Sequence, residues 1–174
     1  MRWAARSLVA ACALVLSVAG LAVPAGAATC AYDPVTLSAT VTVGNGESAT
    51  IVRVGSAITL DGVPCGTATV TTTDTIVVNT TGIPVQIGID LSGGPFEPGA
   101  TAESDASSEI EFTLDLPAGM PILAITGSTG SDHLVVGTGG INLNAGETNG
   151  DADVLITGNP AIVLSGGDGD DVLS

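Results

Sequence analysis

The sequence contains no lysine, and its three positively charged residues are Arg2, Arg6 and Arg53. The chain has 18 aspartates and glutamates, which gives a formal net charge of −15. Proteins that bind nucleic acid neutralise phosphates with clustered Lys and Arg side chains. Two of the three arginines lie at the extreme N-terminus and no cluster is available, so this composition excludes a nucleic-acid-binding protein.

Aromatic residues are also scarce, at 2% of the 174 residues. Beyond residue 27 they are Tyr32, Phe96 and Phe112. Carboxylate pairs for glycoside hydrolysis are available among so many acids, but aromatic platforms that would hold a sugar are not. The sequence also lacks a nucleophile elbow, a zinc-binding cluster and a phosphate-binding loop. We therefore expect no enzymatic activity.

One long apolar run occurs, at residues 8–23, between the positive N-terminus and the small residues 25–27. This order is typical of a secretory signal peptide. We therefore assign residues 1–27 to a cleaved signal and expect a secreted, extracellular protein. No later segment approaches the roughly 18 consecutive apolar residues of a membrane span, so stable membrane insertion after cleavage is not expected. An uncleaved N-terminal anchor is the alternative.

Cysteine is limited to three residues, and Cys12 would be lost with the signal. Cys30 and Cys65 then remain as an even pair in an oxidising compartment, where a disulfide is favoured over a metal or catalytic site. The bond would tie the start of the processed chain to the turn at residues 61–64.

The rest of the chain has the pattern of an all-β protein. From Val35 onward, Val, Thr and Ile alternate with polar residues, and turn residues separate the runs. We expect residues 28–91 to form an N-terminal region of strands and hairpins, and residues 92–108, rich in Gly, Pro, Ser and Ala, to form a polar loop. Residues 109–174 follow as a region of repeats.

The repeats have a period of nine residues. When residues 145–147 are left outside the frame, the eighth position of every block is apolar: Leu116, Ile125, Leu134, Leu143, Leu155, Leu164 and Leu173. Each block predicts a turn followed by a short strand with one inward apolar side chain. Two blocks would make one coil of about 18 residues, so residues that far apart should stack.

The last block, Gly166-Gly167-Asp168-Gly169-Asp170-Asp171-Val172-Leu173-Ser174, fits every defined position of the nonapeptide GGxGxDxUx. With it, the chain resembles the hemolysin-type (repeats-in-toxin) calcium-binding proteins. The segments CAYD, DGVPCG, DTIVVN, IDLSGGPF, SSEIEF and GINLN are similar to the lead-in of exported members of that family. The resemblance implies a right-handed parallel β-roll that holds Ca²⁺ between stacked turns.

Oxygen ligands for a hard cation are concentrated in this region. We expect the carboxylates of Asp171 and Asp153, 18 residues apart, to face each other on one edge of the roll, with Asp132 extending that edge. The full predicted metal site consists of Gly166, Asp168, Gly169, Asp170, Asp171, Asp153, Asp151 and Asp132. On the opposite edge the equivalent residues are Ile141 and Ile162, so calcium is expected on one edge only.

Three other interpretations stay open. The acidic, glycine-rich end is also compatible with a solvated tail. The protein could instead be an extracellular surface, adhesion or matrix module in which calcium is only structural, with an unknown protein or glycan partner. It could also be the N-terminal fragment of a longer repeat protein. Most other acids, among them Asp33, Asp61, Asp74 and Asp90, are expected to be surface charges or turn formers.

Overall fold

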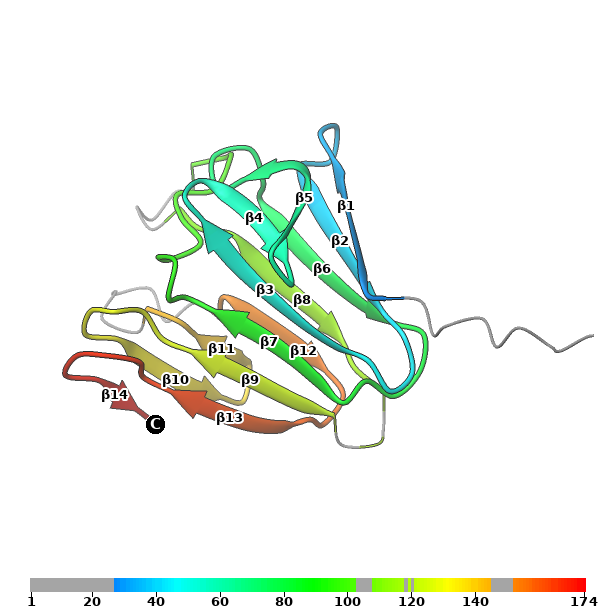
Figure 1. Cartoon of the computed structure of the whole chain (residues 1–174). Coiled ribbons are helices and arrows are strands. Elements are labelled where there is room, and N and C mark those ends of the chain that lie inside the picture. Colours follow the sequence, from blue (N-terminus) through cyan, green and yellow to red (C-terminus); the bar gives the residue numbers. More distant parts are fainter. Residues whose placement is uncertain (1–26, 103–107, 118, 120, 145–151) are drawn as a thin grey trace, which may run out of the picture.

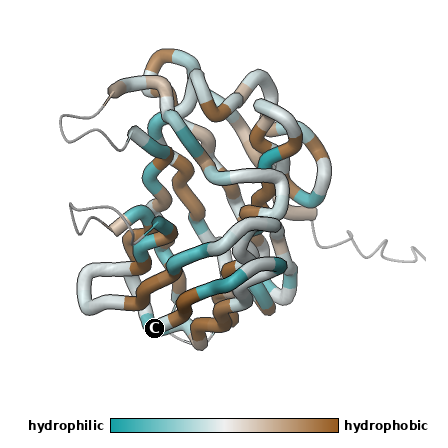
Figure 2. Tube along the Cα trace, turned by 90° about the vertical axis from the view of Figure 1, so that its left-hand side faces the viewer, coloured by the Kyte–Doolittle hydropathy of each residue, from teal (hydrophilic) through white to brown (hydrophobic). Residues whose placement is uncertain are grey.

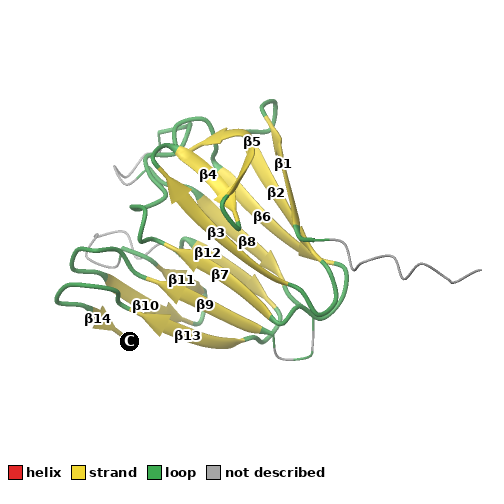
Figure 3. Cartoon of the chain, in the orientation of Figure 1, coloured by secondary structure: helices red, strands yellow, loops and turns green. Residues whose placement is uncertain are grey.

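The computed structural model describes residues 27–102, 108–117, 119, 121–144 and 152–174. Within these residues the chain forms strands and no helix (Figure 3). The strands are β1 (Thr29–Asp33), β2 (Ser38–Val43), β3 (Ser48–Val54), β4 (Ala57–Leu60), β5 (Val63–Thr69), β6 (Thr75–Thr80), β7 (Gln86–Asp90), β8 (Glu111–Asp115), β9 (Ile122–Thr126), β10 (His133–Gly137), β11 (Gly140–Asn142), β12 (Val154–Thr157), β13 (Ala161–Ser165) and β14 (Val172–Leu173).

The strands stack in two facing sheets as a β-solenoid of the β-roll or β-helix type (Figure 1). One sheet has the order β1-β2-β6-β8-β12-β11-β10-β14, and the other has the order β13-β9-β7-β3-β4-β5. The strands β2, β6, β8 and β12 are parallel to one another, as are β3, β7, β9 and β13. Each coil places one strand in each sheet, which confirms the all-β class and the β-roll expected from the sequence.

Alternating side chains fill the space between the sheets. Ala39, Ile76, Phe112 and Val154 pair across four adjacent strands and are all completely buried. Because side chains alternate between the two faces of a strand, one apolar residue in two is enough to build such a column. Figure 2 shows the hydrophobic residues distributed along the strands of both sheets. The core is thus built from stacked aliphatic columns, in which Phe112 is the one fully buried aromatic side chain among the described residues.

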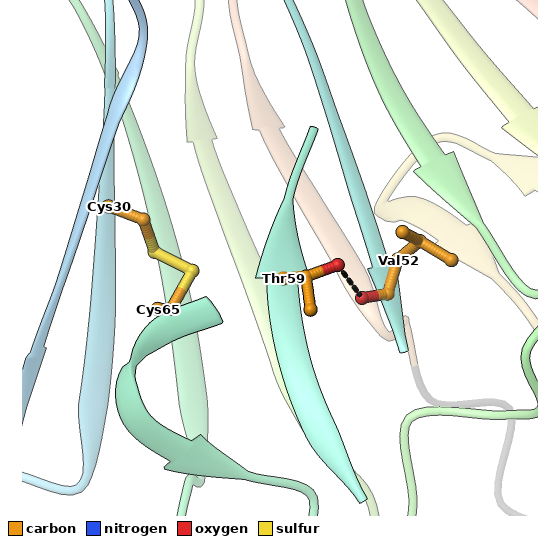
Figure 4. The surroundings of a disulfide bond; sticks show 4 residues. All are labelled: Cys30, Val52, Thr59 and Cys65. Carbon is orange, nitrogen blue, oxygen red and sulfur yellow. Dashed lines mark hydrogen bonds between the residues drawn. A yellow bond between two sulfur atoms is a disulfide. The ribbon is translucent and has the colours of Figure 1, made fainter. Parts of the chain in front are cut away.

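The N-terminal end of the solenoid is closed by extra strands and by a disulfide. β1 pairs antiparallel with β2, and β3, β4 and β5 form an antiparallel meander. Cys30 on β1 is bonded to Cys65 on β5 with 5.1 Å between their Cα atoms, which confirms the predicted pair (Figure 4). Beside it, the buried Thr59 hydroxyl donates to the Val52 carbonyl at 2.9 Å.

The chain between β9 and β12 departs from the predicted register. The block at residues 136–144 does not begin a new half-coil, because β10 turns back into β11 as a hairpin in which Gly137 pairs with Gly140. Two-residue turns rich in glycine favour such hairpins. β12 then pairs with β8 on one side and β11 on the other.

The predicted nine-residue frame agrees with the burial of side chains before this hairpin and fails on β12. Leu116, Ile125 and Leu134 are buried as predicted. Leu155 is wrongly predicted to point inward: it is 48% exposed, while its neighbour Val154 is buried. Val154 pairs with the buried Phe112 and Ile156 with the buried Leu114, so the alternation of β12 is shifted by one residue from the predicted frame and its inner and outer faces are exchanged.

The predicted boundary between residues 28–91 and 109–174 falls inside both sheets, because β6 pairs with β8 and β7 pairs with β9. The intervening loop packs Phe96 edge-on against Phe112, with 5.1 Å between the ring centroids. No helix with the length and apolarity of a membrane span occurs in the described part of the chain.

Candidate metal centre at two stacked turns

Two glycine- and aspartate-rich turns lie side by side at one edge of the longer sheet. The first, residues 127–132 (GSTGSD), leads into β10, and the second, residues 166–171 (GGDGDD), leads into β14. β10 and β14 are parallel neighbours, with His133 paired to Val172. The backbone N–H of Val172 donates to the Asp132 carbonyl at 2.8 Å, so the strand ladder runs directly into the turns. We call this pair of segments the stacked turns.

The glycines of the second turn allow the two backbones to approach closely. Gly167 and Gly169 have φ angles of +90° and +119°, a region that residues with a Cβ rarely adopt. A Cβ on Gly167 would lie 2.2 Å from the Ser128 carbonyl oxygen, and one on Gly169 would lie 2.5 Å from the Gly130 carbonyl oxygen. Backbone carbonyls of the first turn therefore face the second turn at short range.

The carboxylate of Asp132 closes its own turn, and the carboxylate of Asp171 joins the two stacked turns. Asp132 Oδ2 accepts hydrogen bonds from the backbone N–H of Ser128 at 2.8 Å and from its hydroxyl at 3.0 Å. Asp171 Oδ1 reaches across and accepts from the backbone N–H of Asp132 at 2.9 Å. A second bond between the turns runs from the Asp170 N–H to the Ser131 hydroxyl at 3.3 Å. The second Asp171 oxygen folds back toward its own turn, since a Cβ on Gly166 would lie 2.0 Å from it.

The predicted stacking of Asp171 on Asp153 is wrong. β14 pairs with β10 and not with β12, so the neighbour of Asp171 is Asp132, which is 39 residues away in sequence. The coil period is about twice the predicted one throughout the solenoid, because parallel pairing joins Ser38 to Thr75, Thr75 to Glu111 and Ile122 to Ala161, which are 37, 36 and 39 residues apart. The prediction that Asp132 belongs to the same edge is confirmed, but it is the immediate partner of Asp171 and not a more distant one.

Asp153 occupies a different environment. It is 1% exposed, just before β12, and its Oδ2 accepts from the Leu143 N–H at 2.6 Å. Its own carbonyl accepts from the Phe112 N–H at 2.7 Å. These bonds tie the start of β12 to β8 and to the end of the hairpin. Asp153 thus lies on the predicted edge, but β11 separates its strand from β10, and both β11 and β10 separate it from β14.

A cavity of about 520 Å³ lies between the first turn and the loop around Phe96. Its lining is Leu91, Pro95, Phe96, Glu97, Glu109, Ile110, Ser128, Ser131, Asp132, His133, Leu143, Asn144 and Asp153. The Asn144 side-chain amide donates to Glu109 within it. Asp132 and Asp153, which do not stack, therefore border the same hollow.

The remaining predicted site residues are distributed as follows. Asp168 and Asp170 are exposed on the second turn, Gly169 faces the first turn, and Asp151 lies outside the described residues. In the described part of the chain no three or more His, Cys, Asp or Glu side chains gather closely enough to hold a metal ion by themselves. The predicted site also omitted Ser128 and Ser131. The sequence contains a signal for them, because the turn GSTGSD, an imperfect copy of the nonapeptide turn, lies in the repeat frame.

Four other acids accept hydrogen bonds from backbone N–H groups, Asp33 and Asp90 within local turns and Asp61 and Asp74 from segments distant in sequence. Asp61 accepts from the Thr50 N–H, Asp90 from the Ser92 N–H, and Asp74 from the N–H groups of two loop residues, Ala100 and Thr101. Asp33 accepts from the Val35 N–H, and this bond holds the pKa of its carboxyl below the usual value. Part of the acidity of the chain therefore serves to satisfy backbone N–H donors in turns, in a loop and on a strand.

Comparison with known proteins adds no assignment: no protein-family model, curated protein or solved structure matches the chain.

Proposed function

We propose that this protein is a secreted, calcium-binding β-roll protein and that it holds Ca²⁺ at the stacked turns, residues 127–132 and 166–171. The observation that carries the proposal is the direct stacking of the two turns, in which Asp171 accepts a hydrogen bond from the Asp132 N–H and the carbonyls of Ser128 and Gly130 lie close to glycines of the second turn. The fit of the terminal block to the hemolysin-type nonapeptide supports the same cation.

The donor set suits calcium by its chemistry. Ca²⁺ takes six to eight oxygen ligands in flexible geometry and accepts a mixture of carboxylates and carbonyls. The stacked turns offer two carboxylates from adjacent strands, the exposed acids Asp168 and Asp170, and carbonyls that only glycine allows to come so near. Soft-metal ligands are absent from both turns. Asp132, Asp171 and the turn carbonyls would hold the ion.

Binding would act mainly on the cohesion of the C-terminal coil. Asp168, Asp170 and Asp171 lie within four residues of one another, so without a counter-ion their charges repel. A bound divalent cation would neutralise them and stabilise the pairing of β14 with β10. We expect an affinity of the extracellular type, with a dissociation constant of about 10⁻⁴ to 10⁻³ M.

The disulfide between Cys30 and Cys65 and the signal-like N-terminus support an extracellular location, because such bonds persist in oxidising compartments. Extracellular fluids commonly supply calcium at a concentration that a site of this affinity would require.

Isothermal titration calorimetry with CaCl₂, run beside the same titration in excess chelator, tests the proposal. We expect saturable heat, and we expect Asp132→Asn with Asp171→Asn to remove it. Asp61→Asn with Asp90→Asn is the matched control, because these two acids bind backbone N–H groups away from the stacked turns and their replacement should leave the titration unchanged. Absence of binding heat in the unsubstituted protein, together with no change in its melting temperature on adding calcium, would rule the function out.

A further inference from the structure

The inserted hairpin of β10 and β11 opens a gap at the edge where β7 and β9 end. These two strands are adjacent, and just after β7 the Leu91 N–H donates to the carbonyl of Thr126, the last residue of β9, at 2.8 Å. The strands that follow them in the other sheet, β8 and β10, are not adjacent, because β12 and β11 lie between them (Figure 1). At about 4.8 Å per strand, segments that leave one sheet side by side reach the other sheet about 14 Å apart.

The cavity of about 520 Å³ occupies this gap. Leu91 lines it where β7 ends, while Leu143, directly after β11, and Asp153, directly before β12, line it at the inserted strands. Its two sides are the loop that follows β7 and the first of the stacked turns, which follows β9. The second turn follows β13, on the far side of β9, and contributes no lining residue. The cavity is therefore formed by the order of the strands within the solenoid and not by an end of the chain.

The apolar wall of the cavity is held in place by several contacts. Phe96 and Ile110 are 4% and 1% exposed, and the Ile110 N–H donates to the Phe96 carbonyl at 2.9 Å. Arg53 Nη1 holds the same loop through the Pro95 carbonyl at 2.6 Å. A preformed hollow of several hundred Å³, with apolar walls and a few polar groups, is typical of a small-molecule site.

Acidic groups dominate the polar part of the lining. His133 is the one lining side chain that can become positive, and Arg53, the single positive residue of the described chain, lies outside the lining and donates to backbone carbonyls. A hollow lined by charges of one sign and by apolar walls concentrates their field. The lining therefore favours a cation supplied from outside the chain. The acids are Glu97, Glu109, Asp132 and Asp153.

We propose that this cavity binds a small organic cation, namely a primary ammonium group on a short hydrocarbon body. The carboxyl groups would surround the ammonium group, and the wall at Phe96 and Ile110 would cover the hydrocarbon. A bare metal ion fits less well, because within the described ranges no three acidic or histidine side chains gather closely enough to hold one. The inference does not rest on calcium at the stacked turns, although Asp132 borders both sites.

An NMR titration of the ¹⁵N-labelled protein with pentylamine, run in excess chelator, tests the proposal. Pentylamine is protonated at neutral pH. We expect saturable shifts of the Ile110 and Leu143 amide signals with a dissociation constant of about 10⁻³ M, a strength that a ligand of so few atoms can reach. 1-Pentanol has the body without the charge and ammonium chloride has the charge without the body, so each should bind at least about tenfold more weakly. No saturation by pentylamine up to about 50 mM, or equal binding of 1-pentanol, would overturn the proposal.

Glu109→Gln tests the role of the acids, because it removes a charge while the side chain still offers an acceptor to Asn144. We expect pentylamine binding to weaken about tenfold, since a hydrogen bond between two charged groups is replaced by a weaker one to a neutral amide. Glu47→Gln is the matched control, because Glu47 accepts from the Gly44 N–H at 2.7 Å on the turn between β2 and β3. Equal losses in the two variants would show that the overall charge and not the cavity attracts the amine, and would overturn the proposal.

A capped tripeptide with a central lysine distinguishes the two sources of such an ammonium group. Shifts of the same amide signals, with an affinity equal to that of pentylamine or higher, would assign the cavity to a lysine side chain of a polypeptide. Binding of pentylamine without binding of the peptide would assign it to a free amine. Both results support recognition of an alkylammonium group, whereas shifts confined to amides away from the cavity with both probes would contradict it.

Discussion

Asp171 accepts a hydrogen bond from the backbone N–H of Asp132 at 2.9 Å, across 39 residues of sequence. The bond joins two turns that precede parallel strands, so the same contact that aligns β14 with β10 also brings the two carboxylates to one edge of the sheet. Asp153, which has the spacing expected of a partner to Asp171, instead fixes the start of β12 from a buried position.

This arrangement separates the roles of Asp171 and Asp153. Asp171→Asn should lower the apparent calcium affinity about tenfold or more, because it removes a carboxylate from the stacked turns. Asp153→Asn should change it by less than about threefold, since two strands separate it from Asp171. Calorimetric titration of both variants measures the difference, and a larger loss in Asp153→Asn would contradict the assignment.

Asp153 should instead matter for stability. Asp153→Ala leaves the Leu143 N–H without the acceptor that it has at 2.6 Å. An unsatisfied buried donor costs about 1 to 3 kcal/mol, so we expect the free energy of unfolding in urea to fall by that amount. Asp90→Ala is the control, because the Ser92 N–H that it leaves is at an exposed turn and can bond to water. Equal losses in the two variants would show that burial is not the cause.

The glycines of the second turn provide another test. Gly167→Ala introduces a Cβ 2.2 Å from the Ser128 carbonyl oxygen at a φ of +90°. Strain of this kind costs about 1 to 3 kcal/mol, and it should also weaken calcium binding by moving the turns apart. Gly139→Ala adds a Cβ to open space in the hairpin turn, so it should leave both quantities almost unchanged. Urea denaturation and calorimetry together check the pair.

The disulfide stabilises the closed end of the solenoid. Cys30 and Cys65 are 35 residues apart, and a loop of that length is expected to contribute about 4 kcal/mol through restriction of the unfolded chain. Cys30→Ala with Cys65→Ala should lower the free energy of unfolding by about that amount. Calcium affinity should be unchanged where the variant remains folded, because the stacked turns lie at the other end (Figure 1). A similar loss of affinity would contradict this separation.

Arg53 is the single positive residue of the described chain, and it binds backbone carbonyls. Its Nε donates to the Gly55 carbonyl and its Nη1 donates to the Pro95 carbonyl, both at 2.6 Å. The second bond anchors the loop that carries Phe96 beside the cavity. Arg53→Met should lower stability by about 1 to 2 kcal/mol and expose this loop to proteolysis. Arg53→Lys retains one charged donor, so it should lower stability less than Arg53→Met does. Equal stability and equal proteolysis of the two variants would contradict the anchoring role.

Several features follow from the sequence because their causes are local. Alternating Val, Thr and Ile favour strands, whichever strand lies next to them. The even pair of cysteines predicts the disulfide. The Gly-Asp pattern of residues 166–171 predicts a turn that presents carbonyls and carboxylates. The identity of Asp132 and Asp171 as residues of one edge also follows from the nine-residue frame.

Which turns are neighbours was decided only by the tertiary structure. The glycine pair Gly137 and Gly140 closes a hairpin inside the repeat, and burial of Val154 between Phe112 and Ile141 then places β12 beside β8. Both choices depend on pairing between segments that are distant in sequence. Strands with the same alternation and a similar composition are nearly equivalent as partners, so the sequence alone does not choose between them. Sequence therefore specified the strands, the disulfide and the chemistry of the turns, whereas non-local burial chose Asp132 over Asp153 as the partner of Asp171.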